Sequence, residues 1–387
     1  MRTLAEEAVA RCLELAQCTE EAGQITRTFL SPPMRRVHEQ VGGWMSEAGL
    51  DVSIDAAGNL RGLRGSPERR LIVGSHLDTV PNAGAYDGIL GVVLGIALAR
   101  ITSAPLAVVG FSEEEGVRFG VPFIGSRALT GTAQNLLDSD ARIGEAICDY
   151  GLDPLRISEA QLQGAAYFEI HIEQGPVLEH SGLPLGVVDS IAGQSRWTLT
   201  FTGAANHAGT TPMHLRRDAL ACAAEWILAV RQTALETDGL VATVGRCEVE
   251  PGAGNVVPGL AKTSLDVRHK DDAVRFAAVE YLLGEAREIG TRHRVLVKTA
   301  ELLSAPATPM NPRLIEVLSR ACEGFAAPTM TSGAGHDAIV MASTMPAAML
   351  FLRSPGGASH HPDESVLIED VEAALICGKR FVESWNG

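Results

Sequence analysis

The chain has 387 residues, of which 46% are hydrophobic and 20% are charged, and its formal net charge at pH 7 is −15. One hydrophobic core rarely serves a chain of this length, so two domains are expected, and the composition is that of a globular protein. The acidic balance disfavours nucleic acid and anionic membranes as partners, because contact with phosphate needs a basic surface. An anionic ligand would therefore need arginines or metal ions close to it.

The N-terminal residues and the cysteines predict a cytoplasmic protein. The opening stretch "MRTLAEEAVARCLEL" has the pattern of an amphipathic helix and lacks the basic start, apolar stretch and cleavage site of a signal peptide. The longest apolar stretch, "ILGVVLGIALARI", is too short to cross a bilayer. The seven cysteines are scattered and form no C-x-x-C pair, so we expect free thiols in a reducing compartment.

Residues 71–115 alternate between strand and helix patterns. The apolar runs at 71–73 and 104–110 are typical of strands buried on both faces, and residues 87–102 between them have the length and spacing of a helix. This βαβ order predicts an α/β fold, here a mixed sheet flanked by helices. Ligands of such sheets bind beyond the carboxyl ends of the strands, which is where "SHLD" and "SEEEG" fall.

The pattern changes at about Gln194, where strands and helices follow in the order β-α-β-β-α-β. This order predicts a ferredoxin-like α+β domain inserted into the first domain. We expect the inserted domain to span 191–302. The first domain would then be discontinuous, made of 1–190 and 303–387.

Histidine and carboxylate side chains recur at the predicted strand ends and loops. Each has an ordinary alternative: a buried histidine is often structural, and an aspartate before a helix is often its N-cap. Three consecutive glutamates directly after a strand are harder to explain. They remain ionised without a large cost in free energy only near a cation or in full contact with solvent. The candidate ligands are His76, Asp87, one of the glutamates 113–115, His171 and His360, with His361 as an alternative to His360.

Nitrogen and oxygen ligands without cysteine suit zinc or manganese, and cobalt or nickel could substitute. Five ligands are too many for one open catalytic zinc, but they suit two ions that share a bridging carboxylate and hold a water between them. A spare glutamate beside a ligand would then be a candidate general base. The alternative is an acidic surface with stray histidines.

Eight motifs together resemble a known family. "GSHLDTV", "YDGILGV", "SEEEGVRF", "HIEQGPVLE", "HAGTTPM", "RRDA", "SGAGHDA" and "SHHPDES" occur in the order seen in di-metal amidohydrolases of the hydantoinase/carbamoylase type. That type includes allantoate amidohydrolase, N-carbamoyl-L-amino-acid hydrolase and β-ureidopropionase. "HIEQGP" and "HAGTTPM" are specific to this branch, whereas "HLDTV" and the acidic pair are shared with the wider glutamate-carboxypeptidase and aminoacylase superfamily. The resemblance runs from about residue 35 to 370.

The resemblance implies two divalent metal ions per subunit and a set of residues to hold them. His76, Asp87 and His360 match one pattern of metal ligands in the family, in which the aspartate bridges the two ions. Glu115 and His171 match the remaining metal ligands of the family.

The resemblance also implies the residues that act on the bound water. Glu114 is similar to the general base, because the acidic pair of the family directly precedes the glycine, here Gly116; Glu113 is left as a flanking residue. Asp78 is similar to the aspartate that orients His76 through its other ring nitrogen.

The inserted domain resembles the lid and dimerisation domain of the family. His207 is similar to the residue that stabilises the oxyanion, often across a dimer interface. Gln194, Asn255 and Arg268 match positions that hold the polar groups of the substrate, and Arg268 suits a bidentate clamp on a carboxylate.

We therefore expect a homodimeric metal-dependent amidohydrolase that cleaves the ureido C–N bond of a small anionic substrate through a hydroxide bridging the metals. Allantoate and N-carbamoyl-L-amino acids remain alternatives, since Gln194, Asn255 and Arg268 suit either. An aminoacylase or dipeptidase of the same superfamily is a second possibility. A non-catalytic small-molecule-binding protein on this fold is a third.

Overall fold

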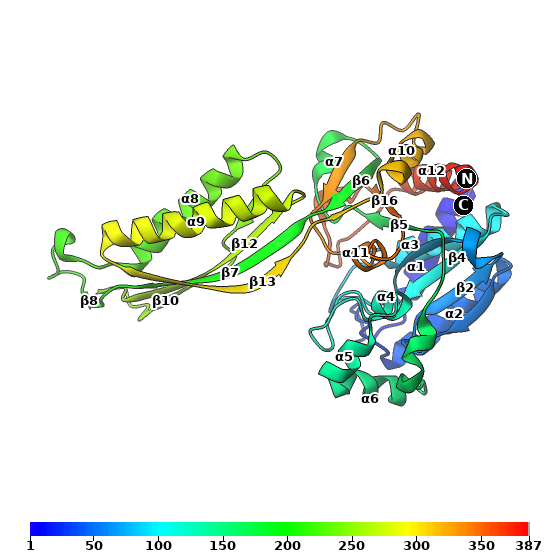
Figure 1. The fold of residues 1–387 in the computed structure, drawn as a ribbon, viewed down its shortest axis with the longest axis horizontal. Coiled ribbons are helices and arrows are strands. Elements are labelled where there is room, and N and C mark those ends of the chain that lie inside the picture. The colour runs from blue at the N-terminus through cyan, green and yellow to red at the C-terminus, as the bar shows by residue number, and fades with distance from the viewer. Residues whose placement is uncertain (386–387) are drawn as a thin grey trace. The chain divides into compact units, whose positions relative to one another are not determined.

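The structure is a computed structural model that describes residues 1–385, and the chain forms two compact units (Figure 1). Unit 1 consists of Met1–Asp189 and the part from Met310 onward, and unit 2 of Ser190–Pro309. The second boundary lies several residues later than expected, because the last long strand of unit 2 continues to Ala305. The chain passes between the units on two paired antiparallel strands, β6 and β14.

Unit 1 contains a mixed sheet, as predicted, with the strand order β1-β2-β4-β3-β5-β16-β6-β14 and β15 paired to β6. The central strands β4, β3, β5 and β16 are parallel to one another, and the pairs β1–β2, β2–β4, β16–β6 and β6–β14 are antiparallel. The strands are β1 (Asp51–Ile54), β2 (Leu60–Arg64), β3 (Leu71–His76), β4 (Leu106–Phe111), β5 (Ala166–Ile172), β6 (Leu185–Ile191), β14 (Thr308–Pro309), β15 (Thr329–Ser332) and β16 (Ala347–Leu352).

Helices cover the sheet of unit 1. Helix α3 is apolar all round, and its residues from Ile89 to Ala99 are buried. Its glycines allow a close approach to the sheet: a Cβ on Gly91 would lie 2.2 Å from the carbonyl oxygen of Ile170 in β5. The helices are α1 (Arg2–Leu15), α2 (Pro32–Glu47), α3 (Ile89–Ile101), α4 (Ile124–Leu129), α5 (Gln134–Ser139), α6 (Ala141–Asp149), α7 (Val177–Ser181), α10 (Pro312–Ala321), α11 (Ala338–Met341) and α12 (Ile368–Ser384).

Unit 2 is an antiparallel sheet with two helices, α8 (Ala219–Glu236) and α9 (Asp272–His293), on one face (Figure 1). The strand order is β10-β12-β7-β13, with β9 on β12, which is the predicted ferredoxin-like arrangement with its second strand split in two. Trp226 of α8 lies in the core, where its Nε1 donates to the carbonyl of Leu282 in α9. The strands are β7 (Gly193–Thr202), β8 (Asn206–His207), β9 (Val241–Thr243), β10 (Cys247–Glu250), β11 (Val256–Val257), β12 (Leu260–His269) and β13 (Leu296–Ala305).

All seven cysteines are free thiols. Within residues 1–385, the structure contains no helix with the length and apolarity that a membrane span requires.

Candidate metal centre and active site

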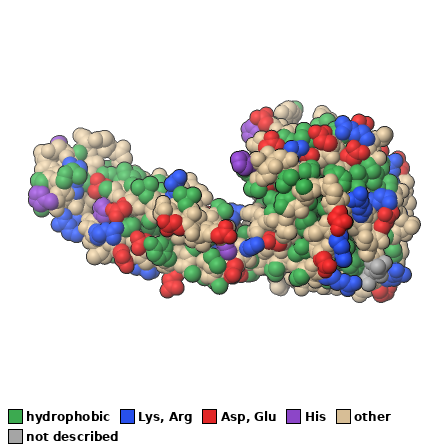
Figure 2. Space-filling model, turned by 90° about the horizontal axis from the view of Figure 1, so that it is seen from above, with side chains coloured by type: hydrophobic (Ala, Val, Ile, Leu, Met, Phe, Trp, Pro, Cys, Tyr) green, Lys and Arg blue, Asp and Glu red, His purple; other side chains and the backbone are tan. Residues whose placement is uncertain are grey.

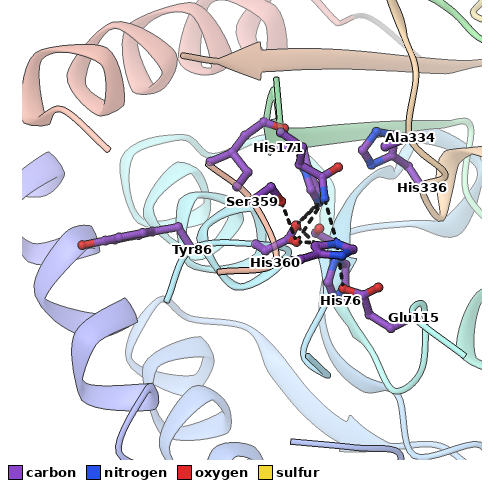
Figure 3. A network of polar contacts seen from close by, with 12 residues as sticks. His76, Tyr86, Glu115, His171, Ala334, His336, Ser359 and His360 are labelled. Atoms are coloured by element: carbon purple, nitrogen blue, oxygen red, sulfur yellow. Dashed lines mark hydrogen bonds and ion pairs between the residues drawn. The ribbon is translucent and has the colours of Figure 1, made fainter. Parts of the chain in front are cut away.

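Five candidate ligands gather at the carboxyl ends of the central strands of unit 1 (Figure 3). His76 is the last residue of β3 and His171 lies in the neighbouring strand β5. Asp87 is in the turn before α3, Glu115 follows β4, and His360 is in the loop after β16. The sheet topology therefore brings together residues that are far apart in the sequence.

The hydrogen bonds of His76 and His171 fix which ring nitrogen faces the centre. Nδ1 of His76 lies 3.0 Å from the carbonyl oxygen of Asp78, and Nδ1 of His171 lies 2.9 Å from that of Ile172. A carbonyl can only accept, so both Nδ1 atoms carry a hydrogen, and in the neutral rings Nε2 holds a lone pair. This is the arrangement of a metal-binding histidine held by a carbonyl on its other nitrogen.

The Nε2 atoms face the carboxylate of Asp87. Nε2 of His171 is buried without a hydrogen-bond partner, 3.2 Å from Oδ1 of Asp87, and Nε2 of His76 lies 3.8 Å from the same oxygen. Burial and the nearby His76 lower the pKa of His171, so its lone pair faces a carboxylate oxygen directly. Two electron-rich atoms in such contact need a cation, and these residues fit a divalent metal ion.

Asp87 also belongs to a second group. Its Oδ2 lies 3.3 Å from Nε2 of His360, which in turn lies 3.5 Å from Oε1 of Glu115. Asp87 is therefore shared by two sets of ligands, His76–Asp87–His171 and Asp87–Glu115–His360. We expected His360 to share a ligand pattern with His76 and Asp87, whereas the structure places His171 beside His76 and places His360 beside Glu115.

The structure separates the two adjacent histidines of the C-terminal loop. His360 has a left-handed backbone with φ 55° and directs Nε2 at the ligand groups. His361 is exposed, and its Nδ1 accepts from the backbone N–H of Asp363. Strained backbone in a non-glycine residue persists where the surroundings over-determine it, and here it turns His360 toward Asp87.

The carboxylate of Asp78 holds the acidic loop and also lies beside the ring of His76. Its carboxylate accepts from the backbone N–H of Glu114 at 3.0 Å and of Glu115 at 3.1 Å. Its Oδ1 lies 3.6 Å from Nδ1 of His76, within ion-pair distance, and the carbonyl oxygen of Asp78 lies closer to the same nitrogen, at 3.0 Å. Asp78 thus fixes the positions of the two glutamates.

Glu114 is buried beside the ligands. Burial raises its pKa well above the ordinary value, the nearby His76 opposes this, and Glu115 reinforces it. Glu113 is fully buried as well, and burial together with Asp78 raises its pKa to about 9. In the absence of a cation this loop therefore carries more carboxyl groups than it can keep ionised.

Asp87 is not the N-cap of α3. That position is Gly88, with φ 70°, and a Cβ there would lie 2.5 Å from the ring of His76. The glycine lets the turn pass against the imidazole and frees the Asp87 side chain for the centre. The ordinary alternative for Asp87 is thereby excluded.

Two residues of the centre had not been predicted. Nε2 of Gln174, a residue with φ 59°, donates to both oxygens of Asp87 at 3.0 and 3.3 Å. Oε1 of Glu364 accepts from the backbone N–H groups of Tyr86 and Asp87 at 2.8 and 3.0 Å. Both lie inside the motifs "HIEQGP" and "SHHPDES", but an amide or acid that holds a ligand has no sequence pattern of its own.

A family model, that of peptidase family M20/M25/M40, matches residues 72–384. The chain belongs to this family. It is 38% identical to the N-carbamoyl-L-amino acid amidohydrolase of Geobacillus stearothermophilus, with 93% of each chain covered. It is 36% identical to the allantoate deiminase of Arabidopsis thaliana, over 98% of this chain and 82% of that one.

A solved structure agrees with these relatives. The crystal structure of an amidase of the hydantoinase/carbamoylase family from Burkholderia multivorans matches with a TM-score of 0.90 and 30% identity, covering 98% of this chain and 97% of that one. The resemblance read from the motifs is confirmed. As a member of this family, the chain is a hydrolase that acts on carbon–nitrogen bonds. Its groups of candidate metal ligands fit the metal dependence of the family.

The substrate-binding residues expected in unit 2 of this M20/M25/M40 chain form two pairs. Gln194 and Arg268 are opposite each other in the β7–β12 ladder, and both side chains donate to Asp266, at 2.7 and 2.8 Å. His207 is opposite Val256, and the carbonyl of Asn255 accepts from Ala208 at 2.9 Å.

The two pairs lie in different sheets of unit 2, Gln194 and Arg268 in the five-stranded sheet and His207 in the two-stranded β8–β11 ribbon. The β7–β12 ladder runs from the pair Gln194–Arg268 to the pair Thr202–Leu260, and the β8–β11 ribbon follows beyond it (Figure 1). A strand rises about 3.3 Å per residue, so β7 alone separates the pairs by roughly 26 Å. One copy of unit 2 cannot bring both pairs to one small substrate.

Proposed function

We propose that the chain is a binuclear amidohydrolase that cleaves the ureido C–N bond of allantoate or of an N-carbamoyl-L-amino acid. The observation that carries the proposal is Asp87, which is shared by two ligand groups and whose Oδ1 lies 3.2 Å from Nε2 of His171 and 3.8 Å from Nε2 of His76. Relatives of similar length act on these two kinds of substrate. The expected cofactors are two divalent ions, zinc or manganese, with cobalt or nickel as substitutes.

The residues of the centre divide the chemistry between them. Divalent ions held by the two ligand groups would polarise the substrate carbonyl and lower the pKa of a bound water. Glu114, positioned by Asp78 through its backbone N–H, would be the group that accepts the proton of the attacking water and passes it to the leaving nitrogen. His207 donates a hydrogen bond to the oxyanion, and Arg268 pairs with the carboxylate of the substrate.

The separation of the two pairs in unit 2 supports a homodimer. If Gln194 and Arg268 bind the substrate from the same subunit, His207 and Asn255 must come from the partner copy, since the length of β7 keeps them apart. A closed dimer with twofold symmetry supplies each site in the same way. Unit 2 then serves both as lid and as dimerisation domain.

The first experiment is ammonia release by purified protein loaded with Mn²⁺, offered allantoate and a panel of N-carbamoyl-L-amino acids in parallel. Turnover of allantoate alone assigns the first substrate, and turnover of carbamoyl amino acids assigns the second. The proposal would be overturned if protein that holds two metal ions released no ammonia from any of these substrates.

Glu114→Gln tests the general base. We expect kcat to fall by about 10²–10⁴-fold, because the amide cannot take the proton. The content of bound metal should stay at two per chain, since Glu114 is not among the proposed ligands. Full activity in Glu114→Gln would show that another group is the base, and elemental analysis of the same preparation separates this from loss of metal.

A further inference from the structure

We propose that Arg216 is a positioning residue for His207: it holds the peptide group between Ala208 and Gly209 in the orientation that makes Nε2 of His207 a hydrogen-bond donor. The inference rests on the proposed function, in which His207 donates to the oxyanion. It explains the arginine of the "RRDA" motif, which neither the metal centre nor the substrate pairs use.

The tautomer of His207 follows from one hydrogen bond. The backbone N–H of Gly209 donates to Nδ1 of His207 at 3.1 Å. A backbone N–H can only donate, so Nδ1 is the unprotonated nitrogen, and in the neutral ring the hydrogen sits on Nε2. This is the reverse of His76 and His171, whose Nδ1 atoms face carbonyl oxygens. His207 is therefore built to donate.

Arg216 acts on the other end of the same peptide group. Its Nη2 donates to the carbonyl oxygen of Ala208 at 2.6 Å, and its Nε donates to that of Thr211 at 3.0 Å. The Ala208 carbonyl and the Gly209 N–H belong to one peptide bond, so the guanidinium both fixes the plane of this peptide and polarises its N–H. Two hydrogen bonds thus connect Arg216, through this peptide group, to the imidazole of His207.

A flipped peptide would have the opposite effect. The Ala208 carbonyl would then face Nδ1 of His207, the hydrogen would move to Nδ1, and Nε2 would present a lone pair. A lone pair repels a developing oxyanion, so the flipped state is inactive in this step. Arg216 excludes it because the carbonyl of Ala208 is held on the far side.

The rest of the loop supports the same geometry. The backbone N–H and the hydroxyl of Thr211 donate to the carbonyl of His207 at 3.1 and 2.8 Å. The loop also carries the exposed side chains of Met213 and Leu215. The end of unit 2 that carries β8 shows histidine, basic and apolar side chains close together (Figure 2). The hydrogen bonds hold the backbone of this loop while its side chains stay available to the substrate and the partner copy.

The neighbouring arginine is a matched control. Arg217 is exposed, and its Nε donates to the carbonyl of Arg294 at 2.9 Å, outside the segment 207–211. Arg217→Ala removes the same charge one residue away without touching the peptide that faces His207.

The test is the tautomer of His207 in the full-length protein, loaded with Zn²⁺ and labelled with ¹⁵N-histidine. The His207 signal is identified by its loss in His207→Ala, and its nitrogen shifts are read at about pH 8, where an ordinary imidazole is neutral. We expect the Nε2–H tautomer in the wild type and in Arg217→Ala. Arg216→Ala should populate the Nδ1–H tautomer, and Arg216→Lys should lie between. An Nδ1–H wild type, or an unchanged tautomer in Arg216→Ala, overturns the inference.

This readout needs no substrate, so it stays decisive if the proposed reaction fails. With a substrate in hand, Arg216→Ala should lower kcat by about 10–100-fold at unchanged metal content, with KM within about threefold, because the donor acts in the transition state. Should Arg216→Ala not fold, Arg216→Lys carries the same test. If kcat fell as much in Arg217→Ala as in Arg216→Ala, Arg216 would have only a structural role.

Discussion

Single hydrogen bonds underlie the roles that we propose for three histidines, His76, His171 and His207. His76 and His171 are held at Nδ1 by carbonyl oxygens, which leaves Nε2 for a metal. His207 is held at Nδ1 by a backbone N–H, which leaves Nε2–H for a substrate oxygen. The same side chain therefore serves as a ligand or as a donor according to the backbone group beside it.

Gln174 holds the carboxylate of Asp87, the proposed bridging ligand, by hydrogen bonds. Gln174→Ala and Gln174→Gly both remove the amide that donates to the two oxygens of Asp87. We expect both to weaken Mn²⁺ binding by about 10–100-fold, as loss of a partner behind a ligand usually does. Titration calorimetry measures the affinity directly.

The two variants differ in backbone strain. The left-handed φ of 59° costs alanine about 1–2 kcal/mol and costs glycine nothing comparable. The melting temperature of Gln174→Gly should therefore exceed that of Gln174→Ala. Unchanged metal affinity in both would mean that the amide only packs against Asp87.

At the scale of elements, the motifs selected candidate ligands that lie close together in the structure, but they did not predict how these candidates are grouped. The ends of buried strands and the motifs located His76, Asp87 and His171. Which ligands share an ion depends on strand order: β5 lies next to β3, so His171 and not His360 is grouped with His76.

The way in which Asp78 divides its contacts between His76 and the acidic loop has the same origin. Whether its carboxylate or its carbonyl lies closer to the ring of His76 depends on a turn of the backbone that no residue pattern encodes. The boundary expected at 302 falls before the end of β13 at Ala305, because the burial pattern of this strand alternates weakly and its end has no clear signal.

The turn before α3 gives an element-scale prediction. Gly88→Ala adds a Cβ 2.5 Å from the ring of His76 at a φ of 70°. We expect a loss of about 2–4 kcal/mol in the free energy of unfolding, from the left-handed backbone and the clash together, and loss of bound metal. Denaturant unfolding and elemental analysis measure the two effects.

Gly43→Ala in α2 is the control for this substitution. Gly43 is exposed, with no atom within 4 Å of a Cβ, so alanine should stabilise the helix by about 0.5–1 kcal/mol. If Gly88→Ala keeps its metal and its stability, the turn is more adaptable than its contact with His76 indicates.

The whole molecule should respond to pH differently with and without metal. Burial raises the pKa of Glu115, Glu169 and Glu364 to about 7, from an ordinary value of 4.5. The folded state without metal thus keeps protons that the unfolded chain releases between pH 4.5 and about 7. The unfolded state binds fewer protons in this window, so the stability of the metal-free protein falls as pH rises.

Bound metal reverses this trend, because divalent charge compensates the carboxylates and binding requires deprotonated ligands. The difference in melting temperature between Mn²⁺-loaded and chelator-treated protein should therefore widen from about pH 5 to pH 8. Comparison at each pH cancels most of the effect of the net charge of −15. A difference that stays constant or narrows would contradict the prediction.

The distance between His207 and the Gln194–Arg268 pair in unit 2 leads to a prediction for the proposed dimer. Glu114→Gln and His207→Ala should each be inactive alone, because one lacks the base and the other the oxyanion donor. In a mixed dimer, the subunit with intact Glu114 receives intact His207 from its partner, so one of the two sites is complete. Random pairing of the two variants therefore restores about a quarter of the wild-type activity.

If His207 instead served its own subunit, every site in the mixture would lack one group, and no activity would return. The length of β7 between Gln194 and the β8–β11 ribbon favours the first outcome. Co-expression with two different affinity tags isolates the mixed dimer and should raise the yield to about half of the wild-type activity. Absence of recovery in that isolated species would place His207 in the active site of its own subunit and contradict the prediction.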